Sequence, residues 1–409
     1  MSYQPQGLKK IYHQTRRLIA KKWLSFFHPL QIGITGSQGK TSVTQTLAKI
    51  LKNDGPTIAT DTNLDTNFNV PITALKVKPW TKYVVWELGV DHIGEMDKHL
   101  EIAKPKIGII TGISPVHTDK EHFGSIDNLI KEKRKLIENL PNKKGVAILN
   151  WDDENVRKMT PFTKAGIFFY GTDKKNCQVY FDPKKIKITI QGTEFILKYK
   201  NKNYKFKTKL IGRHHSYNFS AIFSCLINIF NNPKKAYFLI KKTLKSLKPL
   251  RGRMSIEKGP LKTLILNDSL RANPKSTEEG IKTFYEIPYK KGRKIAVLGV
   301  MGELYDPVLE HKKTAKTLIE FQPNIIIGVG NHRKYTINEA INLGFPKNNI
   351  FYADDVFEAA KILKNILKPG DLIYLKSSLL RNLWRIIKIL KNESICCNNE
   401  LCSYDHCKQ

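Results

Sequence analysis

A glycine-rich turn followed by a lysine and two hydroxyl residues stands in the stretch Gln31 to Ile50, QIGITGSQGKTSVTQTLAKI, between an apolar run and a helical pattern. Gly36 and Gly39 allow a tight turn that aims backbone N–H groups at an anion, and the positive end of the following helix strengthens that attraction. Lys40 is placed to neutralise the β- and γ-phosphates of a nucleotide, and the hydroxyl after it to face a magnesium ion. The alternative is an ordinary glycine-bearing strand-to-helix turn, but Gly-Lys-Thr directly after a strand is a specific signal. The residues predicted to bind the nucleotide here are Gly36, Ser37, Gly39, Lys40, Thr41 and Ser42.

Two further apolar runs, Tyr83–Leu88 and Ile107–Thr111, end in polar residues. The first ends with Glu87, and the second leads into ISPVHTD, which carries His117. Both are expected at the carboxyl edge of a parallel sheet, where open α/β sheets bind ligands. A lone Glu or His is usually structural, so the sequence leaves a metal role and a structural role open at this point.

The composition limits what such a site can serve. The chain has 409 residues, enough for two or three domains, and 69 Lys and Arg against 36 Asp and Glu give a formal charge of +33. That charge favours anionic partners, but the lysines are spread along the chain, so a solvated basic surface is the preferred interpretation over a nucleic-acid patch. Six cysteines, four of them in the last fourteen residues, form no framework across the body, and no run of 18 uncharged apolar residues is present. A soluble, cytoplasmic protein without a signal peptide is expected.

The elements that must position the site come in a clear order. Residues 1–29 predict a basic amphipathic helix, which either packs on the body or lies on an anionic membrane surface through residues 8–27. Thr62 to Pro71 is expected to be a polar loop, and Ile167 to about Leu210 a meander or antiparallel edge of short strands. GRHHSYN, from Gly212 to Asn218, is expected to open a helix.

A second unit is expected to begin near Arg251, because strands and helices alternate again from there. That alternation predicts a second doubly wound parallel sheet. Its first two strands lead into NDSLRANP and GVMGEL, which place Asp268 and Glu303 where a ligand between two domains would be reached. The predicted strands are Thr263–Leu266, Lys294–Leu298, Asn324–Val329, Ile350–Tyr352 and Asp371–Leu375.

From about residue 30 to 378, motif after motif resembles the Mur ligase family. ITGSQGKTS is similar to the family's nucleotide loop, and TNLDTNFNVP to the asparagine-rich loop after it. WELGVDHIGEM and ITGISPVHTDKEHFGS resemble its metal-bearing strand ends, and LNWDD, GRHHSYN, RGRM and GDLIYLKSS follow in family order. NDSLRANP together with VLGVMGELYDPVLEH resembles the subgroup that adds D-alanyl-D-alanine to a UDP-linked muramoyl tripeptide.

The resemblance implies an α/β fold, with a central ATP-binding domain of the phosphate-loop type at 30–250 and a Rossmann-like C-terminal domain at 251–392. It implies an ATP-dependent ligase of peptidoglycan precursor synthesis that forms an amide bond through an acyl phosphate, with ATP and Mg²⁺ as cofactors, acting as a monomer without nucleic acid. Members of the family usually carry a further N-terminal domain that grips the UDP-sugar, whereas about thirty residues precede the nucleotide loop in this sequence.

The same resemblance implies a role for individual residues. The catalytic set is Lys40, His117 and Lys133, the last being the lysine that the family carbamylates, here followed by Arg134 and Lys135 in place of a small and an acidic residue. Magnesium is expected on Thr41, Glu87 and His117. Asn218 is expected near the adenine, Arg253 at the phosphates, Asp268 at the ribose, and Asn273 and Glu303 at the amine substrate.

Two other functions fit the same residues. One is a ligase of this architecture that acts on a polyglutamate or another amino-acid polymer, and it would differ only in the acceptor pocket. The other is a non-catalytic nucleotide-binding scaffold of wall synthesis held at the membrane by the basic helix. The tail at 393–409, with CCNNELCSYDHC, suggests either a reactive tail or a zinc site, and its spacing matches no standard zinc finger.

Overall fold

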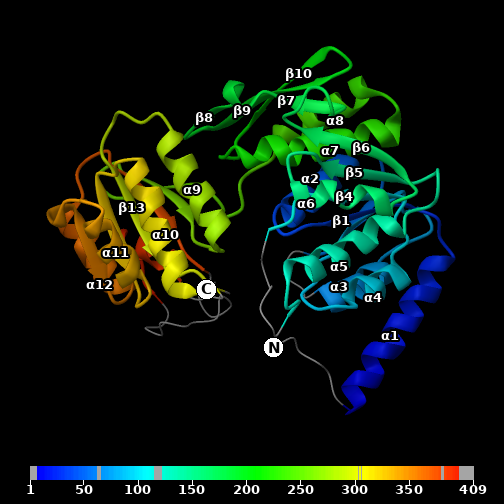
Figure 1. Cartoon of the computed structure of the whole chain (residues 1–409), viewed down its shortest axis with the longest axis horizontal. Helices are drawn as coiled ribbons and strands as arrows, with labels where there is room; N and C mark the ends of the chain where they lie inside the picture. The colour runs from blue at the N-terminus through cyan, green and yellow to red at the C-terminus, as the bar shows by residue number, and fades with distance from the viewer. Residues whose placement is uncertain are drawn as a thin grey trace. The chain divides into compact units, whose positions relative to one another are not determined.

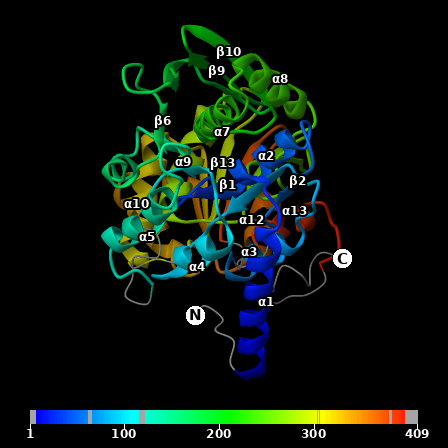
Figure 2. The same cartoon turned by 90° about the vertical axis from the view of Figure 1, so that its right-hand side faces the viewer.

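The computed structural model describes residues 7–61, 66–114, 122–302, 304, 306–378 and 382–395, and only the backbone of Lys10, Thr66 and Asn67. The chain forms two compact units, which are drawn in Figures 1 and 2. The N-terminal unit comprises Met1–Ile186, Glu194–Lys207 and His214–Ser246, and the C-terminal unit comprises Lys187–Thr193, Thr208–Arg213 and Leu247–Gln409.

The first sheet runs in the order β10-β9-β7-β6-β5-β4-β1-β3-β2, with β8 paired to β9. From β2 to β7 the neighbours are parallel, and β7 and β9 are antiparallel. Because β1 lies between β3 and β4, the carboxyl ends of these three strands meet at one edge. The strands are β1 (Leu30–Thr35), β2 (Thr57–Ala59), β3 (Tyr83–Glu87), β4 (Ile107–Ile110), β5 (Val146–Asn150), β6 (Gly166–Gly171), β7 (Val179–Phe181), β8 (Lys187–Thr189), β9 (Gly192–Tyr199) and β10 (Lys202–Thr208).

Two helical layers cover the parallel part of this sheet, and Figure 1 shows them on either side of β1. One layer contains α2 (Lys40–Leu51), α7 (His214–Phe230) and α8 (Pro233–Leu244), which contact one another. The other contains α3 (Thr66–Leu75), α4 (Glu95–Ile102) and α5 (Ile126–Glu138), and α1 (Gly7–Ser25) packs on α3 and α4. The short elements are α6 (Glu154–Arg157) and the 3₁₀ turns Thr160–Phe162 and Pro183–Lys185.

The prediction of a polar loop over 62–71 was wrong where the structure describes it, because α3 begins at Thr66 and contains Pro71. Tertiary packing outweighs the proline, since Val70 and Ala74 are fully buried in the core. Asn69 joins the helix to the chain before it, because its side chain accepts from Asp61 N at 3.1 Å and donates to Asp61 O.

The prediction of a meander from Ile167 was wrong for its first strands. β6 and β7 extend the parallel sheet, because β6 pairs with β5 and β7 with β6 in parallel. The antiparallel part begins only where β9 pairs with β7. The helix predicted from GRHHSYN is confirmed as the start of α7.

The second sheet has the order β11-β12-β16-β13-β14-β15. All neighbours are parallel except β11 and β12, and β11 is an edge strand that sequence analysis missed. The five predicted strands are confirmed within two residues at each end. They are β12 (Leu264–Asp268), β13 (Lys294–Gly299), β14 (Ile325–Val329), β15 (Ile350–Ala353) and β16 (Leu372–Lys376), and β11 is Ser255–Lys258.

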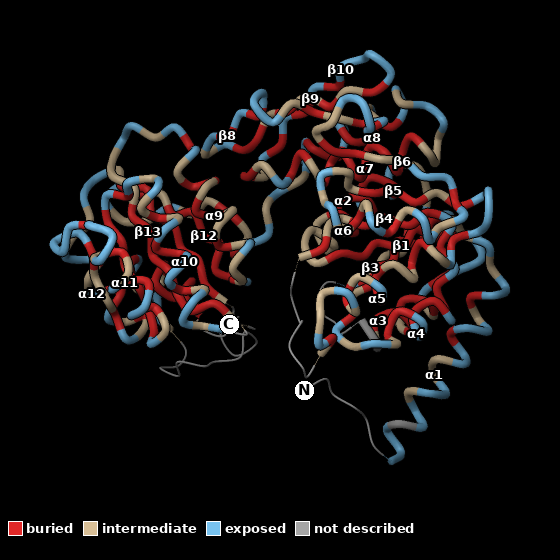
Figure 3. Tube along the Cα trace, in the orientation of Figure 1, coloured by how far each residue is buried: buried red, intermediate tan, exposed pale blue. Residues whose placement is uncertain are grey.

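The helices of the C-terminal unit also lie in two groups. α10 contacts both α9 and α11, and α12 contacts α13. The apolar core between the strands and the second group is made of Ile, Val, Leu and Ala. Figure 3 shows that the strands of this sheet are mostly buried. The helices are α9 (Pro274–Glu286), α10 (Pro307–Glu320), α11 (Arg333–Asn342), α12 (Val356–Ile366) and α13 (Arg385–Leu390), with a 3₁₀ turn at Lys347–Asn349.

Among the helices of the described residues, none is long and apolar enough to cross a membrane. Cys177 and Cys225 are buried free thiols, and burial raises the pKa of the Cys177 thiol to about 12. Of the predicted tail, only residues 393–395 are described, so its four cysteines lie outside the described residues.

Candidate active site

The turn between β1 and α2 has the backbone that the sequence predicted. Gly36 has φ +143° and Gly39 has φ +80°, which other residues rarely adopt. A Cβ on Gly36 would lie 2.1 Å from Thr111 Oγ1, so the chain after β4 presses directly on the turn. Ser37 N donates to Gly112 O at 2.7 Å, and Ser37 Oγ donates to Ser114 O at 3.0 Å. The turn is thus held in place by the segment that follows β4.

Lys40 lies at the first turn of α2, and its Nζ donates to Gly36 O at 2.8 Å, folding the side chain back over the loop. Asn218 of α7 comes to the same place, because a Cβ on Gly39 would lie 3.0 Å from Asn218 Oδ1. The Nδ2 of Asn218 is buried and has no hydrogen-bond partner among the described residues. Asn218 therefore lies beside the phosphate loop with an amide donor to offer a ligand.

Thr41 and Glu87 form the hydroxyl and carboxylate pair of the loop. Thr41 Oγ1 donates to Glu87 Oε1 at 2.8 Å, and the pairing of β1 with β3 sets Glu87 opposite Ile34. The backbone N of Glu87 donates to Thr60 Oγ1 at 2.7 Å. Glu87 Oε2 is buried and has no hydrogen-bond partner among the described residues. A buried carboxylate oxygen of this kind needs a cation or a donor to compensate its charge.

The oxygen atoms of Thr41 and Glu87 suit a magnesium ion. Hard divalent cations take oxygen ligands, and magnesium keeps waters and substrate phosphates beside one or two protein ligands. Thr41 Oγ1 and Glu87 Oε2 supply two such oxygens next to a phosphate loop. His117, the third expected ligand, lies outside the described residues. No group of three or more His, Cys, Asp or Glu suited to a metal occurs among the described residues.

Lys133 of α5 is 2% exposed and lies near four charged side chains. Burial holds the pKa of its amine well below the usual range, and nearby Lys40 lowers the pKa further. The acids Asp91, Glu132 and Glu95 act in the opposite direction with smaller effect. The structure therefore brings Lys133 and Lys40 together, and it favours a neutral amine at Lys133.

Arg134 and Lys135, the unusual neighbours of Lys133, turn away from it. Arg134 pairs with Glu138 and lies over the ring of Phe162. Lys135 Nζ bonds to Glu132 Oε2 at 2.7 Å and to Asp97. Residues one and two positions along a helix face other directions, so the charges of Arg134 and Lys135 are paired with Glu138, Glu132 and Asp97.

Several supporting residues escaped sequence analysis. Thr111 donates to Gln38 O in the phosphate loop, and Asp153 Oδ2 accepts from Ile113 N at 2.7 Å, which fixes the chain after β4. His99 is fully buried and donates from Nε2 to Gly89 O at 2.9 Å, which holds the chain after Glu87. Burial lowers the pKa of His99 to about 4. Their positions after strand ends were the available signal for Thr111 and Asp153, whereas nothing in the sequence marked His99.

In the C-terminal unit, Asp268 ends β12 opposite Lys376 of β16. Lys376 Nζ lies 2.7 Å from Asp268 Oδ2, and Tyr374 Oη donates to the same oxygen at 3.1 Å. Burial and the Asp268 carboxylate raise the pKa of Tyr374 well above its ordinary value. A Cβ on Gly280 of α9 would lie 2.0 Å from Tyr374 Oη, so only glycine lets α9 approach this group so closely. Asp268 thus has one oxygen already compensated inside its own unit.

The other expected residues of this unit are placed as follows. Asn273 caps α9, because its Oδ1 accepts from Ser276 N at 2.8 Å while its N donates to Ser276 Oγ. Arg253 is half-buried in the segment before β11. Glu303 lies outside the described residues. Arg253, Asp268 and Asn273 belong to the C-terminal unit and Lys40 to the N-terminal unit, so their expected roles toward one nucleotide stay predictions.

One imidazole joins both ends of the segment that contains Glu303. His311 of α10 accepts from Met301 N at Nε2, 3.3 Å away, and donates from Nδ1 to Pro307 O at 2.6 Å. Burial, with Arg333 nearby, lowers the pKa of His311 to about 3, so its ring is neutral and Nε2 can accept. The buried Arg333 donates from Nε to Gly299 O at 2.8 Å, at the end of β13. These bonds fix the start and the finish of the expected substrate loop.

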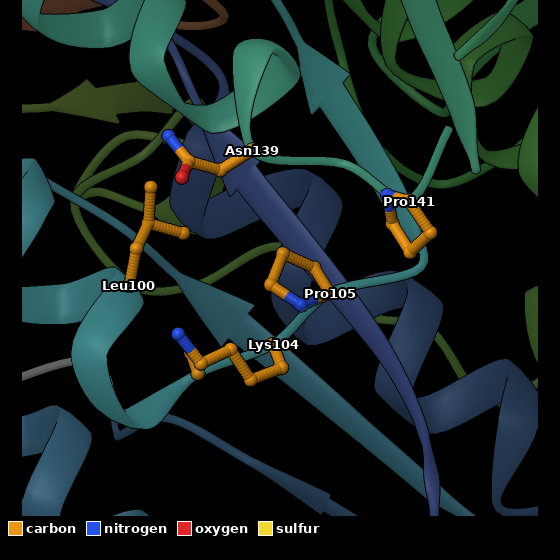
Figure 4. Close-up of a pocket in the computed structure, with 6 residues that line it drawn as sticks. Leu100, Lys104, Pro105, Asn139 and Pro141 are labelled. Atoms are coloured by element: carbon orange, nitrogen blue, oxygen red, sulfur yellow. The ribbon is translucent and has the colours of Figure 1, made fainter. Parts of the chain in front are cut away.

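The pocket in Figure 4 lies at the opposite edge of the first sheet. Leu100 belongs to the last turn of α4, and the other lining residues lie between α4 and β4 or between α5 and β5, near the amino ends of these strands. The phosphate loop lies at the carboxyl ends of the strands, so this pocket is not part of the candidate active site. The lining residues are Leu100, Ala103, Lys104, Pro105, Asn139 and Pro141.

A glycine turn with a lysine and a threonine–carboxylate pair at the carboxyl edge of a parallel sheet defines a nucleotide-binding domain of the phosphate-loop class. A second, Rossmann-like sheet follows it. The family model of the Mur ligase middle domain matches residues 34–226, and that of the Mur ligase glutamate ligase domain matches residues 252–379. The chain belongs to the Mur ligase family.

Curated relatives share one printed name. The chain is 32% identical over 337 residues to the UDP-N-acetylmuramoyl-tripeptide–D-alanyl-D-alanine ligase of Buchnera aphidicola subsp. Baizongia pistaciae, covering 82% of this chain and 69% of that relative. It is 30% identical over 274 residues to the ligase of the same name from Escherichia coli K12, covering 67% of this chain and 58% of that relative.

Solved structures agree on the fold. MurF from Acinetobacter baumannii has a TM-score of 0.80 at 23% identity and covers 93% of this chain and 81% of its own. MurF ligase from Thermotoga maritima, in complex with ADP, has a TM-score of 0.78 at 20% identity, and the match covers 96% of this chain and 87% of that structure's chain.

Proposed function

We propose that this protein is an ATP-dependent ligase that joins D-alanyl-D-alanine to a UDP-linked muramoyl tripeptide, in the cytoplasm, as a step of peptidoglycan precursor synthesis. The observation that carries the proposal is the grouping of Lys40, the Thr41–Glu87 pair and buried Lys133 at one phosphate loop. The names of the curated relatives support the choice of substrates.

The chemistry requires activation of a carboxylate, because an ionised carboxylate is too poor an electrophile for an amine. The carboxylate oxygen attacks the γ-phosphorus of ATP, the bond to the β,γ-bridging oxygen breaks, and an acyl phosphate and ADP form. The amine of the dipeptide then attacks the acyl carbon, phosphate leaves, and the amine proton is lost as the amide forms. Lys40 stabilises the charge on the phosphoryl group during the first step.

Magnesium would be held by Thr41 and Glu87, with His117 as the proposed third ligand, and would neutralise the charge of the phosphates and the carboxylate. In this arrangement the cation would compensate the buried Oε2 of Glu87. Asn218, beside Gly39, is proposed to donate to the nucleotide through Nδ2, while Arg253 and Asp268 are proposed to contact its phosphates and ribose. Asn273 and Glu303 are proposed to position the amine substrate.

Lys133 is proposed to act as a carbamate. A neutral amine adds to CO₂ and releases one proton, which turns a cationic side chain into an anionic one. The environment of Lys133 suits this reaction, because burial favours the neutral amine that reacts. The carbamate would then stand near Lys40 as a compensating negative charge and orient the metal site.

The proposed enzyme is a monomer without nucleic-acid partners, and residues 8–27 are proposed to touch a membrane surface peripherally. The support for that contact is the set of apolar side chains that α1 exposes.

The deciding experiment incubates the purified protein with ATP, Mg²⁺, UDP-muramoyl tripeptide and D-alanyl-D-alanine, and identifies the product by mass spectrometry. We expect the pentapeptide product together with ADP. ADP release only with another acceptor, such as a polyglutamate, would assign a different ligase of this architecture. Absence of ADP with every acceptor of a panel would favour a non-catalytic scaffold.

A further inference from the structure

The helix α1 has two apolar sides, and within the described part of the chain only one of them packs on other elements. On a helix of 3.6 residues per turn, the side chains that pack on the N-terminal unit fall within about 120° of one another. Ala20 and Leu24 are buried there, and Trp23 Nε1 donates to Val77 O at 2.9 Å. Arg17 donates to Lys98 O, and the His13 ring contacts the Phe68 ring in a tilted arrangement with 4.6 Å between the ring centres. This inner side fixes the helix to the chain around α3 and α4.

The outer side carries a second row of apolar residues, also within about 120° on the helical projection. These residues are 54–86% exposed in the described structure, although burying such side chains is normally favourable. Scattered exposed apolar residues are ordinary, but several of them on one helix face, here interrupted by Thr15 and Lys22, mark an interaction surface. The row, called here the outer face, consists of Leu8, Ile11, Tyr12, Leu18 and Ile19, and the exposed Phe26 follows directly after the helix ends at Ser25.

The charge of α1 identifies what the outer face suits. The helix carries six basic residues and no Asp or Glu, within a chain of net charge +33. Lys9, Lys21 and Lys22 are exposed, whereas Arg16 and Arg17 lie partly against the body. On the helical projection Lys22 falls within the outer face and Lys21 falls beside it. A helix that combines exposed apolar and aromatic residues with lysines in this way has the pattern of a helix that lies in the interface of an anionic bilayer. A second copy of this chain would bring six like charges against six.

We propose that the outer face of α1 docks on an anionic lipid surface, with the helix lying in the plane of the membrane and its inner side holding the N-terminal unit. Leu8, Ile11 and Leu18 enter the boundary between headgroups and acyl chains, and Lys21 and Lys22 contact lipid phosphates. The proposal names the lipid class for the membrane contact suggested above, and it does not depend on ligase activity.

The test is co-sedimentation of the full chain with vesicles, without nucleotide. We expect binding to vesicles of phosphatidylglycerol and phosphatidylcholine and none to pure phosphatidylcholine, with loss of binding at high salt. Ile11→Ser with Leu18→Ser is expected to weaken binding at least ~10-fold. Lys21→Gln with Lys22→Gln is expected to weaken it roughly 25-fold, at about fivefold for each lysine.

The matched control is Phe238→Ser with Leu250→Ser, because these side chains are 65% and 56% exposed, against 59% and 68% for Ile11 and Leu18. The control should bind like the parent protein. Equal binding by the Ile11–Leu18 variant and the control would overturn the proposal, and so would a parent protein that stays in the supernatant at low salt. If light scattering shows a dimeric parent and a monomeric Ile11–Leu18 variant, and the parent does not bind vesicles, the outer face is assigned to contact with a second copy. Circular dichroism checks that every variant keeps its helix content.

Discussion

The carboxyl edges of the two sheets bear polar residues in similar positions but use them differently. At the first edge, Glu87 Oε2 and Asn218 Nδ2 are buried without a hydrogen-bond partner among the described residues. At the second edge, Asp268, Lys376 and Tyr374 compensate one another. The first edge is therefore built for a ligand that supplies the missing partners, and the second is stabilised before a ligand arrives. Mutations at the first should change activity, and mutations at the second should change stability.

The largest expected effect is that of Lys40→Ala on turnover. Lys40 is the side chain of the loop that carries a full positive charge, so its loss should lower kcat ~10²-fold or more. The free energy of unfolding should change little, because Nζ makes a half-buried bond to Gly36 O. Lys49→Ala, on the exposed side of the same helix, is the control. Normal ADP release by Lys40→Ala with an unchanged circular dichroism spectrum would remove this loop from the ATP site.

Asp268→Asn should lower the free energy of unfolding, whereas Lys40→Ala should leave it almost unchanged. The Asp268 substitution leaves the Lys376 ammonium, 2% exposed, without its carboxylate, and breaking a buried pair costs about 3 kcal/mol. Urea unfolding of the variant measures this loss. The double variant Asp268→Asn with Lys376→Met should recover part of it, because the unpaired charge is gone. Nucleotide use should also weaken if Asp268 holds the ribose. Unchanged stability would contradict the view that the second edge is already compensated.

Lys133→Ala tests the role of the buried lysine at the carboxyl edge of the first sheet. The variant should lose roughly tenfold or more of its ligase activity, because the proposed carbamate is removed from the metal site. Parent enzyme prepared without bicarbonate should be slower than enzyme supplied with it, whereas Lys133→Ala should not respond. Lys131→Ala, an exposed neighbour on α5, should behave like the parent. Normal turnover by Lys133→Ala would also remove the residue-by-residue match of this helix to the family.

The smallest effect concerns the two buried imidazoles, one in each unit. The pKa of His99 is lowered to about 4 and that of His311 to about 3, against 6.5 in the unfolded chain. The unfolded state therefore binds protons first, so each contribution to stability is complete above pH 6.5 and is lost as the pH falls toward those values. The free energy of unfolding of His99→Gln and of His311→Gln should approach that of the parent between pH 6.5 and 4. For either variant, a difference in free energy of unfolding from the parent that stays constant across that range would show that the pKa of that histidine is not lowered in the fold.

The sequence by itself determined the phosphate loop and the strand ends that carry Glu87 and Asp268, whereas the order of the strands in the two sheets came from the structure. Gly36, Gly39 and Lys40 are local signals, because a turn with positive φ and the first residue of a helix depend on neighbours in the chain. The apolar runs of parallel strands are similarly local, and the five strands of the second unit were predicted within two residues.

Only the tertiary structure decided which of these groups meet. Burial of Val70 and Ala74 turned a polar, proline-containing segment into α3, against its local preference. The long-range contact of α7 with the loop placed Asn218 beside Gly39, and the packing of α5 buried Lys133 enough to lower its pKa. The division of α1 into an inner and an outer side depended on α3 and α4 covering one of two apolar rows. Periodicity shows that a face is apolar, but only the neighbours brought by the fold show whether that face is covered.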